Sequence, residues 1–217
     1  AKYMGDGGPK MVYISNPTEY GTLYSRKELE ELSRVCREHD LYLFMDGARL
    51  GYGLAASDNE LDLPFLAEHC DVFYIGGTKV GALFGEAVVI VNEELKKDFR
   101  YFIKQKGGML AKGRLLGIQF ETLFEDDLYM EISRHAIRMA EKLREAFRKK
   151  GYPFLVENRT NQIFPVMPDS VLEKLSGSYG YSYQERVDDT HSAVRFCTSW
   201  ATKEENVNSL IEDLNNC

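Results

Sequence analysis

Two chemically reactive side chains follow neighbouring apolar runs in this sequence. Asp46 comes directly after the run of residues 41–45, and Lys79 follows the run of residues 72–75. Open α/β sheets place their ligand sites beyond the carboxyl ends of buried strands, so both side chains are predicted to face one cleft. The alternatives are ordinary. Asp46 could cap the segment that follows its strand, and Lys79 could be one of the many solvated lysines.

The flanks of Lys79 favour chemistry over simple exposure. Gly76 and Gly77 precede it and free the backbone to turn tightly. Residues 73–75 and 80–84 surround it with mostly apolar side chains. Desolvation lowers the pKa of a lysine towards the neutral, nucleophilic amine. We therefore expect Lys79 to lie in an apolar setting and to act as a nucleophile.

A third candidate is Arg195, a single arginine that interrupts the alternating strand predicted over residues 193–197. A guanidinium group suits bidentate capture of a carboxylate, although an exposed cross-strand charge is the alternative. His191 lies in a loop near Arg195 and is the only histidine kept as a candidate for the substrate site. Structural roles are expected for the other three.

Composition excludes several classes of function. The 217 residues are 44% hydrophobic and 28% charged, close to the averages of soluble globular proteins, and they allow one large or two modest domains. A net charge of -7 argues against a nucleic-acid or anionic-membrane partner. The four cysteines show no CxxC spacing, which favours reduced thiols and a cytoplasmic location. The chain opens at Ala1 without an initiator methionine, as a cut inside a longer protein would.

The first part of the chain alternates strand and helix signals, which favours a layered α/β fold. Ser25 and Glu28 make a capping box at the start of the first helix. Continuous apolar runs are typical of strands covered on both faces of a parallel sheet. The strands are predicted at 11–15, 41–45, 72–75 and 87–91, with a short helix at 63–69.

Beyond residue 91 the pattern changes first to helices and then to short antiparallel strands. The helices are predicted at 93–104, 113–124 and 130–149, and Gly151 ends the last of them. The later strands are predicted at 154–157, 163–167, 181–185 and 193–197, with a helix at 170–175. A closing helix is expected from Thr202, with Glu205 completing a capping box. We therefore divide the chain into a larger domain, 1–150, and a small α+β domain, 151–217.

Taken together, the motifs resemble one enzyme family. Asp46-Gly47-Ala48-Arg49, the later Gly77-Thr78-Lys79 and the upstream segment 18–22 (TEYGT) are similar to the threonine aldolase and β-eliminating lyase family of pyridoxal-phosphate enzymes. The resemblance runs through nearly the whole chain. It implies an aspartate-aminotransferase-like α/β fold, with part of a mostly parallel three-layer sheet in the large domain and a small α+β carboxy-terminal domain. The family's amino-terminal third, with its phosphate-binding loop, is not in this chain.

The resemblance also implies a role for each candidate residue. Lys79 would bind pyridoxal 5'-phosphate covalently and later transfer a proton, and Asp46 would pair with the pyridine nitrogen of the cofactor. Arg49 would lie beside the cofactor, and Arg195 would bind the α-carboxylate of the substrate. Thr78 would reach the cofactor phosphate.

One departure concerns the phosphate. The family has an arginine shortly after a Gly-Gly-Met stretch, which serves the phosphate across a subunit interface, whereas here Gly107-Gly108-Met109 is followed by Leu110. Lys112 or Arg114 could supply the charge instead.

By the same resemblance, the parent protein is expected to be a lyase that cleaves a β-hydroxy-α-amino acid to glycine and an aldehyde. A homodimer or homotetramer is implied, since the family's active sites take residues from two subunits. Two alternatives within enzymes stay open: β-elimination from another amino acid, and transamination. A third is that this chain is an inactive fragment or a partner-dependent scaffold.

Overall fold

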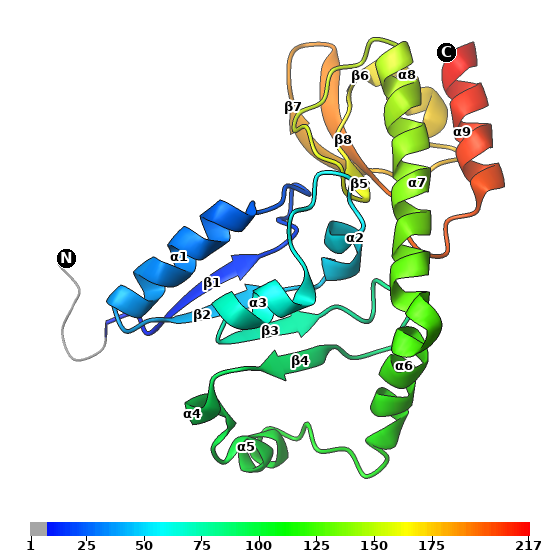
Figure 1. Ribbon diagram of the computed structural model, residues 1–217. Helices are drawn as coiled ribbons and strands as arrows, with labels where there is room; N and C mark the ends of the chain where they lie inside the picture. The colour runs from blue at the N-terminus through cyan, green and yellow to red at the C-terminus, as the bar shows by residue number, and fades with distance from the viewer. Residues whose placement is uncertain (1–7) are drawn as a thin grey trace.

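The computed structural model describes residues 8–217, so the opening residues 1–7 lie outside the described part of the chain. The first of two sheets has the strand order β1-β2-β3-β4 (Figure 1). The three leading strands run parallel and the fourth is antiparallel to β3, so the predicted mostly parallel sheet is confirmed. Its strands are β1 (Met11–Ser15), β2 (Tyr42–Asp46), β3 (Val72–Ile75) and β4 (Ala87–Ile90).

Helices α1 (Arg26–Glu38) and α3 (Leu63–His69) pack on one face of this sheet, and the short helix α2 (Leu50–Leu54) follows β2. The capping box of Ser25 and Glu28 is present, as predicted. Every second strand residue points into this layer, which forms the first apolar cluster. The buried members from the strands are Ile14, Leu43, Met45, Phe73 and Ile75.

The opposite face of the sheet carries exposed apolar side chains, among them Met11 and Val88. Among residues 8–217, α4 (Glu93–Lys96) and α5 (Phe99–Gln105) border a hollow on this face that residues of all four strands also line. These two short helices leave the strands' side chains open to the hollow, so the described residues supply two of the three expected layers. The single helix predicted over 93–104 is wrong. It breaks at Asp98, whose φ of 57° is left-handed and interrupts the helical hydrogen bonds.

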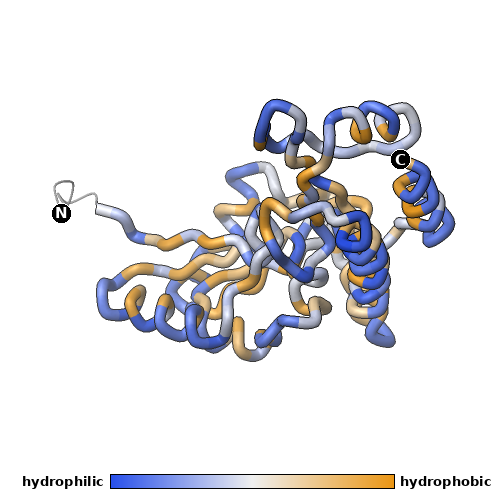
Figure 2. Tube along the Cα trace, turned by 90° about the horizontal axis from the view of Figure 1, so that it is seen from above, coloured by the Kyte–Doolittle hydropathy of each residue, from blue (hydrophilic) through white to orange (hydrophobic). Residues whose placement is uncertain are grey.

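Helix α6 (Arg114–Phe124) leads through the 3-10 turn η1 (Glu125–Asp127) into α7 (Leu128–Lys149). Figure 1 shows α7 running past both sheets, and its residues contribute to the buried clusters beside each of them. Hydrophobic residues gather along the strands, whereas hydrophilic residues dominate the outer helix surfaces (Figure 2). No helix within residues 8–217 is long and apolar enough to span a bilayer.

The second sheet is antiparallel and centred on its longest strand, β8, which pairs with the other three. Its strands are β5 (Gln162–Ile163), β6 (Val166–Pro168), β7 (Ser182–Arg186) and β8 (His191–Cys197). Helices α8 (Asp169–Leu175) and α9 (Glu204–Asn216) pack with α7 around a second apolar cluster. That cluster draws on α7, so the proposed domain boundary near Gly151 stays a prediction.

Three details of this part were predicted wrongly. Residues 154–157 form no strand but a single bridge from Phe154 to Pro165. The strand expected at 163–167 is two strands, separated at Phe164-Pro165, because proline has no N–H for the ladder. Helix α9 has Lys203 at its N-cap and no side-chain cap, since the Thr202 hydroxyl accepts a hydrogen bond from the Ser199 amide at 2.8 Å instead.

Candidate active site

A backbone-to-backbone contact joins the loops that follow β2 and β3. The amide of Gly76 donates to the carbonyl of Gly47 at 2.9 Å. A Cβ atom on Gly47 would overlap the carbonyl oxygen of Tyr74, and one on Gly76 would overlap the carbonyl group of Ala48. Only residues without side chains therefore allow the loops to touch. This contact brings the loop of Asp46 against the loop that leads to Lys79.

Asp46 is held as a carboxylate. Burial opposes its charged form, but hydrogen bonds from Tyr13, Tyr74 and the Ala48 amide, together with the charge of Lys79, outweigh burial and lower its pKa below the ordinary value of 3.8. The Ala48 amide donates to Oδ1 at 2.9 Å, and the Tyr13 hydroxyl donates to Oδ2. The two tyrosines were not predicted as site residues, because nothing in the sequence gives the register that sets Tyr13 beside β2.

Lys79 lies in a loop whose backbone is held by the buried side chain of Tyr52. The hydroxyl of Tyr52 donates to the Lys79 carbonyl and accepts from the Trp200 amide at 3.2 Å. Burial raises the pKa of Tyr52 to about 12, so it stays protonated as a donor. The expected apolar setting of the Lys79 side chain is wrong for the described residues. The flanking Val80 and Ala82 face the core, which leaves the lysine exposed.

The Thr78 side chain binds Glu86, an acidic residue that the sequence analysis did not identify as part of the site. Its hydroxyl and the Gly77 amide both donate to the carboxylate of Glu86. Glu86 therefore fixes the turn just before Lys79. A contact from Thr78 to a cofactor phosphate stays a prediction, and its hydroxyl already has an acceptor.

Arg49 and Arg195 are linked through two residues. Arg49 is largely buried, with its Nη1 3.6 Å from a carboxylate oxygen of Glu19. The Gln162 side chain donates through Nε2 to the Glu19 carbonyl at 3.1 Å and accepts from Arg195 Nη1 at 3.2 Å. The chain of contacts thus runs from the loop after β2 to the second sheet. Gln162 is fully buried, and its place in this chain was not foreseen.

Two further side chains hold the same loop. Asn158 donates to the carbonyl of Tyr20 at 2.9 Å, and Thr160 donates to the carbonyl of Gly21 at 3.0 Å. With Gln162, three alternate residues of one segment bind three consecutive carbonyls of the loop. The small second sheet is in this way tied to the segment that carries Glu19.

Lys112 and His191 lie outside this cluster. Lys112 is exposed in the connection between α5 and α6, and the described residues show no ion pair to it. The His191 Nδ1 lies 3.1 Å from Asp188 in the β7–β8 connection, where it closes a turn.

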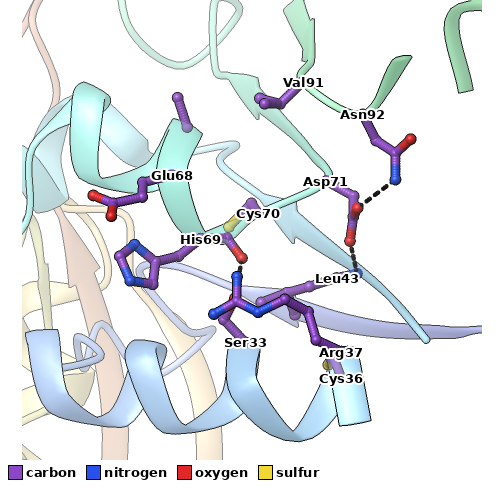
Figure 3. Close-up of a pocket in the computed structure, with 11 residues that line it drawn as sticks. Ser33, Cys36, Arg37, Leu43, Glu68, His69, Cys70, Asp71, Val91 and Asn92 are labelled. Carbon is purple, nitrogen blue, oxygen red and sulfur yellow. Dashed lines mark hydrogen bonds between the residues drawn. The ribbon is translucent and has the colours of Figure 1, made fainter. Parts of the chain in front are cut away.

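A separate hollow lies between α1, α3 and the ends of β2 and β4 (Figure 3). Its polar groups bind one another. Asp71 accepts from the Leu43 amide at 2.8 Å and from Asn92 at 2.7 Å, and Ser33 donates to the His69 carbonyl at 2.7 Å. Its volume of about 160 Å³ is below the roughly 300–1,000 Å³ of ordinary ligand pockets. The hollow is therefore not a second candidate site.

Comparison with known proteins finds relatives of this chain, both by sequence and by structure. The low specificity L-threonine aldolase of Pseudomonas aeruginosa is 32% identical over 208 residues, which cover 95% of this chain and 59% of that protein. The threonine aldolase of Leishmania major superposes with a TM-score of 0.93 at 43% identity, covering 96% of this chain and 61% of the other.

A more distant structure agrees in fold alone. The putative L-allo-threonine aldolase of Listeria monocytogenes has a TM-score of 0.75 at 20% identity. The chain spans about three fifths of the length of its relatives from Pseudomonas and Leishmania. The model of the β-eliminating lyase family matches residues 6–170, which is more than half of the chain. The chain therefore belongs to the β-eliminating lyase family.

Proposed function

We propose that the protein is a pyridoxal-phosphate-dependent lyase that cleaves a β-hydroxy-α-amino acid to glycine and an aldehyde. The observation that carries the proposal is the junction at Gly47 and Gly76, which sets the ionised Asp46 against the loop of Lys79. The names of the relatives, which are L-threonine aldolases, support the substrate class.

The residues present fit the cofactor. A carboxylate that stays ionised suits a pyridine nitrogen, and an accessible amine suits covalent attachment of an aldehyde. Asp46 would hold the nitrogen and Lys79 would carry the cofactor, with Arg49 beside it. Thr78, and Lys112 from a second subunit, would meet the phosphate. When bound, pyridoxal phosphate supplies an electron sink for the bond that breaks next to the substrate α-carbon.

The remaining work falls to side chains of the protein. Arg195 binds the substrate carboxylate, and its Nε atom is buried without a hydrogen-bond partner among the described residues, as expected of a donor meant for a ligand. Holding the carboxylate orients the substrate, and such positioning can lower a barrier by several kcal/mol. Lys79 would also move a proton at the substrate α-carbon.

We also propose that the protein works as a homo-oligomer. Large apolar side chains are exposed on the loop after Lys79 and on the α5–α6 segment, and exposed apolar surface of this kind marks interaction sites. They are Leu83, Phe84, Tyr101, Phe102, Met109, Leu110, Leu115 and Ile118. Lys112 lies within this segment, so a second subunit could receive it. Replacing Leu115 and Ile118 with aspartate should shift the protein towards monomers in sedimentation velocity and weaken cofactor binding.

A cytoplasmic location completes the proposal. All four cysteines are free, and Cys36 and Cys70 are buried as thiols. Unpaired thiols are typical of reducing compartments. Fractionation of the source cells with an antibody to the protein checks this point.

The test of function uses the natural full-length protein loaded with pyridoxal phosphate. Borohydride reduction and peptide mapping should find the cofactor on Lys79 and nowhere in Lys79→Ala, with the exposed Lys97→Ala as the matched control. Glycine and an aldehyde from L-threonine support the proposal. A keto acid with release of ammonia indicates β-elimination, and a keto acid with transfer of the amino group indicates transamination; either result would reject aldol cleavage.

A further inference from the structure

Gln162 is a buried amide whose two ends are both in use at the junction of the two sheets. Its side chain is fully buried, with Nε2 bound to the Glu19 carbonyl and Oε1 bound to Arg195 Nη1. The amide cannot flip without losing both hydrogen bonds, because a carbonyl can only accept and a guanidinium can only donate. Its orientation is therefore determined by two partners that lie on different parts of the fold.

The contact with Gln162 holds one terminal nitrogen of the Arg195 guanidinium. A guanidinium can bind a carboxylate side-on through Nε and Nη2 or end-on through its two terminal nitrogens. Gln162 accepts from one of the two N–H groups of Nη1, at 3.2 Å. The buried Nε has no hydrogen-bond partner among residues 8–217. Among residues 8–217, the contact with Gln162 uses one of the five N–H groups of this guanidinium, and the others stay unused by the protein.

The strand register explains why this residue can reach the arginine. Gln162 on β5 pairs with Cys197 on β8, and Arg195 lies two residues earlier on the same face of β8. Diagonal neighbours of this kind are within reach of long side chains. The Glu19 carbonyl at the other end of the amide belongs to the loop whose carboxylate pairs with Arg49.

We propose that Gln162 is a positioning residue that holds the guanidinium of Arg195 in place for the substrate carboxylate and couples it to the Glu19 loop. The inference rests on the proposed role of Arg195 in substrate binding. Gln162 itself touches neither substrate nor cofactor. It acts by holding the Arg195 guanidinium in place before the ligand binds. Binding then does not have to order this side chain, and the free energy that ordering would cost is not lost.

The experiment compares two amines bound to the natural full-length protein loaded with pyridoxal phosphate. Glycine has a carboxylate and ethanolamine has none, and both affinities are read from the absorbance of the bound cofactor. Gln162→Met keeps the volume and removes both hydrogen bonds. We expect it to weaken glycine roughly threefold to tenfold and to leave ethanolamine unchanged, as for one side chain that must now be ordered on binding. Gln184→Met on β7 is the matched control and should behave as the unaltered protein.

Gln162→Glu is a second variant, in which the new side chain binds Arg195 more strongly instead of releasing it. Its carboxylate would pair with Arg195 and compete with the ligand, so glycine should weaken more than in Gln162→Met. For the lyase reaction, KM should rise in both variants with a smaller change in kcat. In an Arg195→Met background, Gln162→Met should have no further effect, since a residue that acts through another shows full coupling in such a cycle.

The outcomes separate this inference from the proposed function. If Arg195→Met retains the preference for glycine over ethanolamine, the proposed carboxylate role of Arg195 fails, and the inference about Gln162 falls with it. If Arg195→Met abolishes that preference while Gln162→Met leaves it intact, or weakens both amines equally, only the positioning role is overturned. Loss of glycine affinity alone, with full coupling to Arg195, supports the inference.

Discussion

The contact between Gly47 and Gly76 makes a sharp prediction about stability. Replacing Gly76 with alanine places a Cβ atom 2.7 Å from the carbonyl oxygen of Gly47 and closer still to the carbonyl group of Ala48. These are backbone atoms, which cannot rotate away as a flexible side chain would. The two loops must therefore separate, or β2 and β3 must shift.

The magnitude follows from the cost of overpacking. Insertion of a methyl group into a filled site costs about 1–3 kcal/mol, and a rigid backbone neighbour favours the upper end of that range. For a chain of this size, each kcal/mol lowers Tm by about 2–4 °C. Gly76→Ala should therefore lose about 6–12 °C. Gly117→Ala is the control, because nothing lies within 4 Å of its added Cβ in helix α6. It should gain about 0.5–1 kcal/mol.

The assay is reversible thermal or urea unfolding of the two variants beside the unaltered protein. Affinity for pyridoxal phosphate should fall in Gly76→Ala and stay unchanged in Gly117→Ala, because only the first separates Asp46 from the lysine loop. Equal Tm values for the two variants would refute the reasoning. So would a destabilised Gly76→Ala that binds the cofactor with unaltered affinity, since the contact would then not position the site.

Three other substitutions test the surroundings. Gly21→Ala should cost about 1–3 kcal/mol in urea unfolding, because Gly21 has a φ of +75° and its Cβ would overlap the Thr160 hydroxyl. An unchanged midpoint would contradict the close packing of this loop against Thr160. Tyr13→Phe removes a donor to the Asp46 carboxylate, so the pKa of Asp46 should rise. The stability that this carboxylate contributes is fully present above its unfolded pKa of 3.8 and is lost as pH falls through the folded pKa. In the variant the contribution should be smaller and its loss complete at a higher pH, as unfolding curves measured below about pH 5 would show. Arg144→Met should cost about 3–5 kcal/mol, because Arg144 is buried between Glu141, Asn158 and the Thr160 carbonyl, whereas the exposed Arg148→Met should cost less than about 1 kcal/mol.

Local signals predicted much of the fold. The apolar runs located all four strands of the first sheet, and the Ser25 box marked the start of α1, because burial and capping act within a few residues. The break at Asp98 and the uncapped start of α9 escaped prediction. In each case the side-chain pattern was compatible with a helix, and the outcome depended on a backbone conformation or a competing hydrogen bond.

In the candidate site, too, local sequence signals identified some residues, whereas long-range contacts determined the others. Asp46 and Lys79 were found because the end of a buried strand is a recognisable position. Tyr13, Glu86 and Gln162 were not, because their roles come from contacts with residues far along the chain that depend on strand register and on loop geometry. The apolar flanks of Lys79 pointed to the core rather than to its amine, which is why the expected desolvation of its side chain was wrong.

Helix α7 has a consequence for how the molecule opens. Its first half contributes Tyr129, Ala136 and Ile137 to one buried cluster, and its second half contributes Leu143 and Phe147 to the other. Amide protons near the middle of the helix can exchange with solvent only when packing on both sides is lost. We expect them to be the slowest-exchanging amides of the chain, and to report the global unfolding free energy. The two halves of this molecule should then melt as one cooperative unit, even though their sheets share no strand.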